Sequence, residues 1–526
     1  MGFQIIEIFN RSVTIERFNG DCFKTEDVCQ VYLDDKPIMK TCKNVFSIYG
    51  LKPDTEYSVT IEYRGQRKTR TFVTERESYL LDVTKFGAVG DGTTDDTVAI
   101  QAAIAACPED GTVYLPKGMY LCSPLFMKSN MTLLFAEGAM LIGQSDRDKY
   151  PILPGVVRNI YDNNRELNLA SWEGNPLDSF ASLITAIHVE NLNIIGQGTI
   201  DGNADSGDWW QYPKQRIRAY RPNIVFLNRC RNVRVQGVKI CNSPAWTVHP
   251  YYSDNVSFSD IEICNPYDSP NTDGFDPESC ENVKLIGARI SVGDDCVAIK
   301  SGKYYMGQKA YKPTINVVIR NCHFELGHGS ITIGSETACG VMDVNVSQCI
   351  FSETDRGIRL KTRRGRGSRA FIDNIKASNI VMDKVHMPVT ANMFYFCDPD
   401  GHSTEVQDQN PREVDSKTPR IGLLSFENMK CTGTDAAFMC VYGLPEMPIE
   451  RVVIKNVEAE FLPGAERKPA CPIMMDDFPE MSGVGIYAKN VRELDIDGVT
   501  IKGSADSDVR LCNVKVQNID GLTFTD

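Results

Sequence analysis

Short runs in which apolar and polar residues alternate make up most of the first 75 residues. The runs are QIIEIF, SVTIERF, CQVYLD, NVFSIYG, YSVTIEYRG and RTFVTE. Alternation with a period of two is typical of strands with one buried face. Several such strands at short spacing predict a small β-sandwich. We place this domain at residues 1–76 and a second domain at residues 77–526.

One segment of the predicted sandwich has a more specific pattern. The sequence LKPDTEY at residues 51–57 resembles the tyrosine-corner segment of fibronectin type III domains. The resemblance implies a fibronectin type III-like sandwich. Because the matching segment is short, an unrelated β-module is the alternative.

Beyond residue 79 the pattern changes to an irregular repeat of short β-branched strands. Asn232 begins NVRVQGVKI, Asn255 begins NVSFSDIEI and Asn282 begins NVKLIGARI. A unit this small cannot bury its own apolar face, so the copies must stack on one another. Strand repeats without helical halves predict an all-β fold, a right-handed parallel β-helix. The absence of a leucine ladder excludes a leucine-rich repeat.

A single helix is predicted near the start of the second domain, over residues 94–107. Thr94 is the expected N-cap, and Asp95 and Asp96 would favour the positive end of the helix dipole. Together with Asp91 these aspartates could also form a metal cluster. We favour a turn and a helix cap, because no glutamate follows at the spacing of a calcium loop.

The 18 cysteines are interpreted as reduced residues of the core. They show no CxxC pairing within the repeats, which argues against metal ligands. We expect those that recur within the coils to stack inward: Cys230, Cys241, Cys264, Cys280, Cys296, Cys322 and Cys349.

The ends and the charge of the chain limit its partners. The opening MGFQIIEIFN has no basic stretch followed by an apolar core, so we expect a cytoplasmic protein, or a secreted one if a leader is missing. The sequence contains no run of about 18 apolar residues, so we expect no membrane span. The net charge of −13 argues against nucleic acid and membranes, which are both anionic. It would also repel an acidic polysaccharide unless the charge is reversed locally.

Polar clusters recur about once per predicted coil. They are NTD at 271–273, GDD at 293–295, GHG at 327–329 and RLK at 359–361. Matching positions on neighbouring coils lie one strand spacing, about 4.8 Å, apart. We therefore expect the four clusters to lie side by side on one wall of the β-helix.

Three aspartates packed together suit glycoside hydrolysis. Their mutual repulsion raises at least one pKa, which keeps one carboxyl protonated beside ionised neighbours. One acid can then protonate the leaving oxygen while a base activates water. Arg359 and Lys361 could bind a sugar carboxylate. A lone aspartate in a β-helix turn more often bonds its own backbone, and we assign this turn-forming role to Asp201 and Asp276.

The order NTD, GDD, GHG and R-x-K is similar to that of the polygalacturonase family, glycoside hydrolase family 28. The resemblance also includes DVTKFGAVGDGTTDDTVAIQAAI, GQGTIDG and NSPAWTVHP, and runs from about residue 81 to the C-terminus. Four motifs in order at coil spacing are far more specific than any one of them. The form with an N-terminal sandwich is most like bacterial exo-polygalacturonases.

The resemblance implies roles for the clustered residues. Asp294 matches the general acid, Asp273 and Asp295 match the carboxylates that activate water, and His328 matches the histidine that supports the acid. The family inverts the anomeric centre, so the resemblance implies direct attack by water. We then expect acid and base carboxyls about 6.5–9.5 Å apart.

The resemblance also implies a substrate and the residues that bind it. Arg359 and Lys361 match the substrate-binding pair, Asn271 belongs to the NTD motif, and Tyr395 is the candidate for a tyrosine on a later coil. Core packing is equally expected for Tyr395. The expected substrates are galacturonic acid oligomers or polygalacturonate, and no metal or cofactor is expected. The sequence gives no indication of oligomeric state.

A basic run at residues 355–369 reverses the local charge, with seven basic residues and one acid. Such a run could attract a polyanion. For Arg366 and Arg369, a solvated basic loop is a fair alternative.

Two other functions and the mode of attack stay open. A pectate lyase would share the fold and substrate but would need calcium and a basic proton abstractor. A glycan-binding β-helix without activity would tolerate changes of the carboxylates. Three candidate insertions, 152–178, 205–221 and 397–419, could close one end of the cleft, which would favour attack from a chain end.

Overall fold

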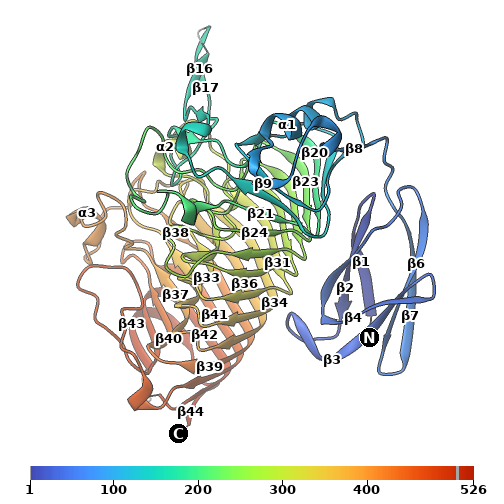
Figure 1. The fold of residues 1–526 in the computed structure, drawn as a ribbon. Coiled ribbons are helices and arrows are strands. Elements are labelled where there is room, and N and C mark those ends of the chain that lie inside the picture. The colour runs from blue at the N-terminus through green and yellow to red at the C-terminus, as the bar shows by residue number, and fades with distance from the viewer. Residues whose placement is uncertain (1, 160, 505–508, 526) are drawn as a thin grey trace.

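The computed structural model describes residues 2–159, 161–504 and 509–525. Figure 1 shows an elongated stack of parallel strands with two small sheets beside it at the N-terminus. The stack is a right-handed parallel β-helix, and the N-terminal sheets form a β-sandwich, so the predicted fold class is confirmed. Among the described residues, no helix is long and apolar enough to cross a membrane.

The sandwich contains a three-stranded sheet with the order β1-β2-β5 and a four-stranded sheet with the order β4-β3-β6-β7, both antiparallel. The hydroxyl of Tyr57 accepts a hydrogen bond of 3.0 Å from the backbone N–H of Lys52, as in a tyrosine corner. The strands are β1 (Gly2–Ile8), β2 (Ser12–Phe18), β3 (Lys24–Leu33), β4 (Lys36–Lys43), β5 (Val45–Tyr49), β6 (Glu56–Tyr63) and β7 (Gln66–Val73).

Most early coils of the β-helix contribute one strand to each of three parallel faces. The first face contains β8 (Leu80–Asp82), β10 (Gly111–Leu115), β13 (Met131–Phe135), β20 (Glu190–Gly196), β23 (Arg231–Gln236), β26 (Asp254–Ser259), β28 (Glu281–Ile286) and β31 (Thr314–Arg320). The second contains β9 (Asp91–Asp95), β11 (Gly118–Cys122), β14 (Ala139–Gly143), β21 (Thr199–Asp201), β24 (Lys239–Cys241), β27 (Glu262–Cys264), β29 (Arg289–Ser291) and β32 (His323–Glu325).

In later coils the first two faces merge into long strands, and the third face stays separate until β42, which pairs with both β40 and β41. The merged region contains β34 (Val341–Ser352), β36 (Phe371–Asp383), β38 (Arg420–Ile421), β39 (Leu423–Thr434), β41 (Ile449–Phe461), β42 (Val484–Lys502), β43 (Val509–Asn518) and β44 (Leu522–Thr525). The third face, which positions the candidate site, contains β12 (Leu125–Phe126), β19 (Ile184–Ile187), β22 (Val225–Asn228), β25 (Val248–Tyr251), β30 (Asp295–Ile299), β33 (Gly329–Ile333), β35 (Arg356–Lys361), β37 (Met387–Asn392) and β40 (Ala437–Tyr442).

The asparagines that begin the repeats form a ladder along the β-helix. Asn232 donates to Asn191 (3.0 Å), Asn255 to Asn232 (3.1 Å), and Asn282 to Asn255 (3.1 Å). Each of these residues has a positive φ between 54° and 59°. Asparagine tolerates this left-handed conformation, and its amide can donate and accept along a stack. Both properties explain why asparagine recurs at this position.

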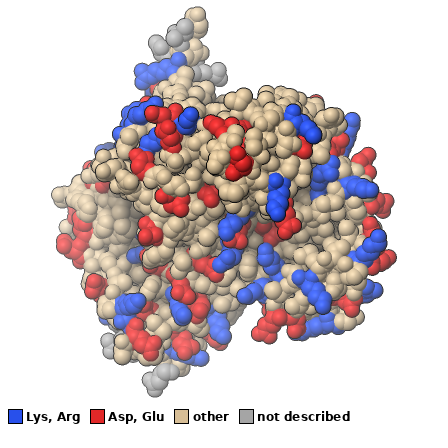
Figure 2. Space-filling model, viewed as in Figure 1, with Lys and Arg blue, Asp and Glu red and all other residues tan. Residues whose placement is uncertain are grey.

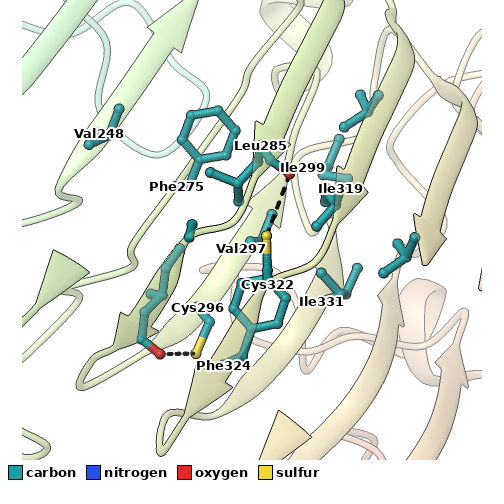
Figure 3. Close-up of a cluster of buried hydrophobic side chains, with 14 of the residues drawn as sticks. Val248, Phe275, Leu285, Cys296, Val297, Ile299, Ile319, Cys322, Phe324 and Ile331 are labelled. Atoms are coloured by element: carbon teal, nitrogen blue, oxygen red, sulfur yellow. Dashed lines mark hydrogen bonds between the residues drawn. The ribbon is translucent and has the colours of Figure 1, made fainter. Parts of the chain in front are cut away.

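A continuous apolar core fills the β-helix. Val248, Phe275 and Val297 occupy matching positions on successive coils, and Figure 3 displays this stack. The predicted inward cysteines are buried, as expected, except for Cys264, which is only partly buried. All 18 cysteines are free thiols. The buried thiols pack as small core groups, and several donate to backbone carbonyls.

The predicted helix begins later than expected. Helix α1 spans Thr97–Ala106, and its N-cap is Asp96 rather than Thr94. Thr94 lies in β9 instead, because that segment pairs with β11. The carboxylate of Asp96 accepts from the backbone N–H groups of Val89 (2.6 Å) and Gly90 (3.0 Å), so it fixes the preceding loop.

The two neighbouring aspartates bond to local backbone. Asp91 accepts from the N–H groups of Thr93 (2.9 Å) and Thr94 (2.7 Å), and Asp95 accepts from Thr97 N–H (3.1 Å). These contacts agree with the predicted turn and cap roles. The carboxylates of Asp91 and Asp95 thus accept hydrogen bonds from the protein backbone and are not arranged around an ion.

The sandwich is docked against the first face through buried polar contacts. Glu16 is 1% exposed and accepts from Nε (2.6 Å) and Nη2 (2.8 Å) of Arg320 and from Asn321 (2.8 Å). A Cβ atom at Gly237, where φ is +78°, would lie only 2.0 Å from the hydroxyl of Tyr49. Glycine is therefore required where the tyrosine approaches the coil.

The connection between the two parts contains the proposed domain boundary. Strand β7 ends at Val73 and β8 begins at Leu80, so residues 76 and 77 lie between them. Arg11 of the sandwich pairs with Glu77, which also accepts from Thr112 of the β-helix. These contacts hold the connection against both parts.

Insertions between coils surround the third face. The first carries two short antiparallel pairs, and its β16–β17 hairpin projects at the top of Figure 1. The strands are β15 (Ile152–Leu153), β16 (Val157–Asn159), β17 (Asp162–Leu167) and β18 (Ser179–Phe180), and the remaining helices are α2 (Tyr304–Lys309), α3 (Thr404–Gln407), and the 3-10 turns η1 (Val83–Phe86), η2 (Arg147–Lys149), η3 (Ala204–Ser206) and η4 (Gly464–Glu466).

Candidate active site

The four predicted clusters lie together on the third face. Asp273 lies two residues before Phe275, which pairs with Val248 on the preceding coil and with Val297 on the following coil. Asp295 begins β30. Asp295 pairs in register with Gly329 of β33, directly after His328. Arg359, in β35, pairs with Thr332 of β33 on the preceding coil. Parallel stacking thus brings residues far apart in sequence onto one wall, as the repeat predicted.

The three aspartates are closer together than expected. Asp273, Asp294 and Asp295 each place a carboxylate oxygen within 4.8 Å of the others. The expected acid-to-base separation of about 6.5–9.5 Å is therefore wrong. The reason is the fold itself, because adjacent residues and adjacent coils place side chains at about one strand spacing.

Asp295 is held as an ionised carboxylate. It is 1% exposed; its Oδ2 accepts from Lys361 Nζ (2.8 Å) and its Oδ1 from Arg359 Nη1 (3.3 Å). Burial opposes ionisation, but Lys361 and Arg359 outweigh it and hold the pKa of Asp295 well below its usual range. Arg359 also lies 2.8 Å from the sulfur of Met474. In this state both cations contact an aspartate of the protein itself.

The pKa of Asp273 is shifted in the opposite direction to that of Asp295. Burial, followed by repulsion from Asp294, raises its pKa to about 7, although Lys300 opposes this shift. The ammonium of Lys300 lies 3.6 Å from Asp273 Oδ2. The three carboxyls therefore differ in pKa, as expected, but the raised pKa belongs to Asp273, whereas the resemblance assigned the protonated acid to Asp294, whose pKa is lowered.

The interpretation of Asp276 as a turn former is wrong. Its side chain is fully buried, and neither of its oxygens has a hydrogen-bond partner among the described residues. Lys300 Nζ lies 3.5 Å from Asp276 and 3.4 Å from Glu336. Burial, and then the charge of Asp273, raise the pKa of Asp276 well above its usual range. Asp201, in contrast, accepts from the N–H of Asn203 (2.8 Å), as a turn former does.

Asp294 and His328 form a pair at the edge of the cluster. His328 Nδ1 lies 3.3 Å from Asp294 Oδ1, and the histidine side chain is 46% exposed. Burial opposes ionisation of Asp294, but the hydrogen bond from His328 outweighs it, so the pKa of Asp294 is lowered. The same hydrogen bond raises the pKa of His328. Both shifts favour a proton on His328 over one on Asp294.

Asn271 and Tyr395 both line the pocket around the aspartates. The side-chain oxygen of Asn271 accepts a hydrogen bond from Arg221 Nη2 (2.8 Å), which fixes the orientation of its amide group. Tyr395 is 9% exposed, with Lys361 Nζ 5.4 Å from its ring centre. Burial raises the pKa of Tyr395 well above its usual range, so its hydroxyl stays protonated.

Residues from all three predicted insertions also line this pocket, which has a volume of about 100 Å³. Glu173 comes from the first insertion, Lys214 from the second and Asp398 from the third. Lys214 forms an ion pair with Glu173. Lys303 Nζ lies 4.0 Å from Glu173 and 2.9 Å from Asp398. This chain of ion pairs, Lys214–Glu173–Lys303–Asp398, links the insertions beside the site; we call it the insertion ion-pair chain.

The basic run at 355–369 does not form an exposed positive surface. Arg363, Arg364 and Arg366 are buried, and they pair with Asp398 or Glu446. The alternative of a solvated loop is therefore wrong for Arg366, because the third insertion contributes the carboxylate that covers it. Basic and acidic side chains are interspersed across the face in Figure 2 rather than gathered by sign.

Several pocket residues were not identified from the sequence. Lys300 Nζ stacks 4.3 Å from the ring centre of Trp246, which belongs to the NSPAWTVHP motif. The apolar run CVAI at residues 296–299 of β30 could have marked Lys300, since a lysine that directly follows a buried apolar strand is unusual. Glu173 and Lys214 carry no such signal, because insertions do not follow the repeat.

The aspartate triad is the one acidic group in the described ranges with oxygens close enough to hold a metal ion. Lys300, Lys361 and Arg359 lie 2.8–3.6 Å from two of its members. These cations already balance much of the negative charge, and a divalent ion would be repelled by them. The donor set suits proton transfer better than metal binding.

Comparison with known proteins agrees with this geometry. Residues 162–460 match glycosyl hydrolases family 28, and residues 80–145 match the group described as rhamnogalacturonase A/epimerase, pectate lyase-like. A probable polygalacturonase from Vitis vinifera is 29% identical over 73% of this chain and 75% of its own length. An exo-poly-alpha-D-galacturonosidase from Dickeya chrysanthemi is 29% identical over 61% of this chain and 59% of its own length.

Solved structures share the architecture. The Thermotoga maritima exopolygalacturonase is 26% identical, with a TM-score of 0.66 over 81% of this chain and 93% of that one. The Yersinia enterocolitica family 28 exopolygalacturonase has a TM-score of 0.68 over 99% of both chains at 19% identity, which shows a common fold through both parts. Because the family match covers more than half of the sequence, this chain belongs to glycosyl hydrolase family 28 and is a glycoside hydrolase.

Proposed function

We propose that the protein hydrolyses α-1,4-linked galacturonic acid chains, as polymer or oligomers, and that it removes units from a chain end. The observation that carries this proposal is the triad of aspartates with divided pKa values beside Lys300, Arg359 and Lys361. The carboxyls supply acid and base, and the cations favour an anionic sugar. The similarity to polygalacturonases from plants and bacteria supports the same substrate.

For the chemistry, we assign the general acid to the Asp294–His328 pair. A proton held by His328 can move to Asp294 and then to the glycosidic oxygen when the bond breaks. Asp295 is ionised in the free protein and serves as the base that orients the water. Asp273, with a pKa of about 7, shares this base role when it is ionised.

We infer direct attack by water from the family resemblance. The close spacing of the carboxyls is, in contrast, typical of retaining enzymes. A retaining mechanism needs one carboxylate as a nucleophile. Both oxygens of Asp295 accept from cations, and Asp273 holds a proton up to about pH 7. Both features reduce nucleophilicity, so we favour inversion.

The insertion ion-pair chain supports attack from a chain end. Three of its members, Lys214, Glu173 and Asp398, come from the three insertions, the fourth, Lys303, directly precedes α2, and all four line a pocket of about 100 Å³. The backbone N–H of Lys303 donates to Gly174 (3.0 Å), and a Cβ at Gly174 would lie 2.6 Å from Glu336 Cγ. The turn that carries Glu173 is thus seated tightly against the wall, where it would block a continuing polymer.

The alternative of β-elimination requires a basic proton abstractor. Burial lowers the pKa of Arg359, but Asp295 outweighs burial and raises it above its usual value. An arginine paired in this way is a poor base. An inactive glycan-binding role conflicts with membership of a hydrolase family.

The test is a product analysis on polygalacturonate and on oligomers of defined length, with and without a calcium chelator. We expect saturated galacturonic acid monomer as the dominant early product, a slow fall in polymer viscosity, and no effect of the chelator. Unsaturated products lost on chelation would establish a lyase instead. A rapid viscosity drop with mixed oligomers would refute attack from a chain end.

A further inference from the structure

A fourth buried carboxyl, that of Asp276, lies beside the three aspartates of the site. Asp276 is on the same segment of the chain as Asp273, and its side chain is fully buried. Its backbone N–H donates to the carbonyl of Val248 on the preceding coil (2.8 Å), and the carbonyl of Phe275 accepts from Ala298 on the following coil (2.9 Å). Because the backbone is bonded on both sides, Asp276 cannot turn toward solvent unless the coil opens.

A single ammonium group serves three carboxyls here. Lys300 Nζ lies 3.5 Å from Asp276 Oδ1, 3.6 Å from Asp273 Oδ2 and 3.4 Å from Glu336 Oε2. Burial opposes ionisation of Glu336, but Lys300 and two further cations outweigh it and lower the pKa of Glu336 to about 2. Glu336 therefore balances much of the charge of Lys300. Ionising both aspartates as well would leave an excess of buried negative charge.

The preceding coil does not supply a second cation to Asp276. His249 of β25 is the register partner of Asp276 on that coil. Its Nε2 contacts Oε2 of Glu278 at 2.9 Å, and both of these side chains are fully buried. The histidine is thus engaged by another carboxyl. Among the described residues, Lys300 is the one cation that forms an ion pair with Asp276.

A proton on Asp276 would satisfy the contact between the two aspartates. The side chains of Asp273 and Asp276 lie within hydrogen-bonding reach of each other. Carboxylates only accept hydrogen bonds, so as an ion Asp276 has no partner for either oxygen among the described residues. A proton turns one of these oxygens into a donor, with Asp273 as its acceptor. Burial, and then the charges of Asp273 and Asp295, raise the pKa of Asp276 and favour this state, although Lys300 opposes it.

We propose that Asp276 is a positioning residue for the catalytic base: it stays protonated and donates a hydrogen bond to Asp273, which favours the ionised form of Asp273 and orients its carboxylate. A buried carboxylic acid can serve as a neutral donor in this way. The proton stays on Asp276, so Asp276 acts through Asp273 and not on the substrate. The proposal rests on the proposed hydrolysis, in which Asp273 shares the role of the base.

Two variants separate a hydrogen-bond donor from a charge. Asp276→Asn keeps an N–H donor at this position, whereas Asp276→Leu has a similar size and no polar atom. We expect Asp276→Leu to shift the ionisation of Asp273, and the rise in rate that follows it, upward by about one to two pH units, the effect of one hydrogen bond to a charged group. In Asp276→Asn the rise should stay close to its wild-type position. Asp435→Leu removes another buried carboxyl, in the turn before β40, and is the control whose rise should not move.

Two further measurements need no substrate. A protonated carboxyl has an infrared C=O stretch that a carboxylate lacks. Above the pKa of Asp273, about 7, the difference spectrum of wild type and Asp276→Asn should therefore contain this band for wild type. The free energy of unfolding should fall as pH rises through the pKa of Asp273 in the folded state, and this fall should occur at higher pH in Asp276→Leu than in Asp276→Asn.

The outcomes distinguish this role from its alternatives. A downward shift of the rise in Asp276→Asn would mean that Asp276 is ionised and acts by repulsion, which would overturn the proposal. Identical shifts in Asp276→Asn and Asp276→Leu, or a missing infrared band, would overturn it as well. If the wild-type protein does not hydrolyse galacturonic acid chains, the proposed function fails, and the infrared band and the unfolding curves still decide the role of Asp276. If Asp276→Leu does not fold, the infrared band and the pH profile of Asp276→Asn decide it.

Discussion

The ammonium of Lys361 donates a 2.8 Å hydrogen bond to Oδ2 of Asp295, where both side chains are almost fully buried. This contact makes Lys361 part of the acid–base group as well as a candidate partner for substrate. The sequence assigned only the second role to it. The difference matters because a buried ion pair is strongly destabilised when one partner is removed.

Lys361→Ala should therefore reduce both turnover and stability. The uncompensated charge of Asp295 should lower the free energy of unfolding by about 3 kcal/mol and raise the pKa of Asp295. Urea unfolding and oligogalacturonide kinetics check this, with the exposed Lys384→Ala as the control. Unchanged stability together with a raised KM alone would mean that Lys361 serves only the substrate.

The pKa of Asp273 predicts a pH dependence of stability. A carboxyl whose pKa rises on folding, here from 3.8 to about 7, stabilises the fold at low pH and loses this contribution as pH rises through the folded value. The wild-type protein should therefore lose on the order of 2–4 kcal/mol between about pH 4 and pH 7 from this group. Asp273→Asn should lack this loss and be more stable than wild type near pH 8.

Denaturant unfolding at several pH values measures the difference between the two proteins. The exposed Asp35→Asn serves as the control, since it changes the same chemical group outside the cluster. Parallel stability curves for wild type and Asp273→Asn would show that another group holds the proton.

The contact between Glu16 and Arg320 predicts how firmly the sandwich is docked. Burial opposes ionisation of Glu16, but its bonds from Arg320 and Asn321 outweigh burial and lower its pKa. Glu16→Ala leaves Arg320 without its partner and should cost about 3 kcal/mol, whereas the exposed Glu26→Ala should be nearly neutral. Because a lowered carboxyl pKa stabilises above the unfolded value, docking should weaken as pH falls below about 4.

Limited proteolysis of the connection near residue 76 is a direct readout of docking. Faster cleavage in Glu16→Ala than in Glu26→Ala is the expected result. Equal cleavage rates would mean that other contacts, such as those of Gln236 with Ser12 (2.7 Å) and Thr14 (2.9 Å), hold the sandwich without Glu16.

The periodic parts of the molecule could be predicted from the sequence, and the irregular parts could not. Asn232, Asn255 and Asn282 repeat because each coil needs the same turn and the same ladder of amides. The repeat also converts the separations among Asp273, Asp294 and His328 into spatial proximity. Once the coil length is known, the residues that line the site can be predicted from the motifs that recur once per coil.

Residues outside the repeat required the three-dimensional structure. Glu173 and Lys214 lie on insertions whose paths are set by packing rather than by periodicity. The burial of the basic run could not be predicted either. Arg363 and Arg364 have the same sequence whether their side chains are solvated or form buried ion pairs. Asp276 was mistaken for a turn former for the same reason.

The insertion ion-pair chain predicts the control of the product pattern. Glu173→Ala removes the partner of Lys214 and one partner of Lys303, so the closed side of the pocket should loosen. Early products should then shift from monomer toward mixed oligomers, with a faster drop in polymer viscosity. The exposed Glu137→Ala is the control. Monomer as the sole early product of Glu173→Ala would show that the seated backbone turn, rather than the charges, closes the site.

The pairing of Asp294 with His328 predicts the effects of the acid on rate and stereochemistry. Asp294→Asn should lose about 10²–10⁴-fold in turnover, the usual contribution of general acid catalysis, while still binding tetragalacturonate. The wild-type rate should be bell-shaped in pH, because Asp295 must be ionised while the Asp294–His328 pair retains its proton, and the two limits belong to the coupled group. NMR of the first sugar released should detect the β-anomer from an α-linked chain. If the α-anomer appears first, the close spacing of the three carboxylates reflects a retaining mechanism, and one of Asp273 or Asp295 must be the nucleophile despite its proton or its cations.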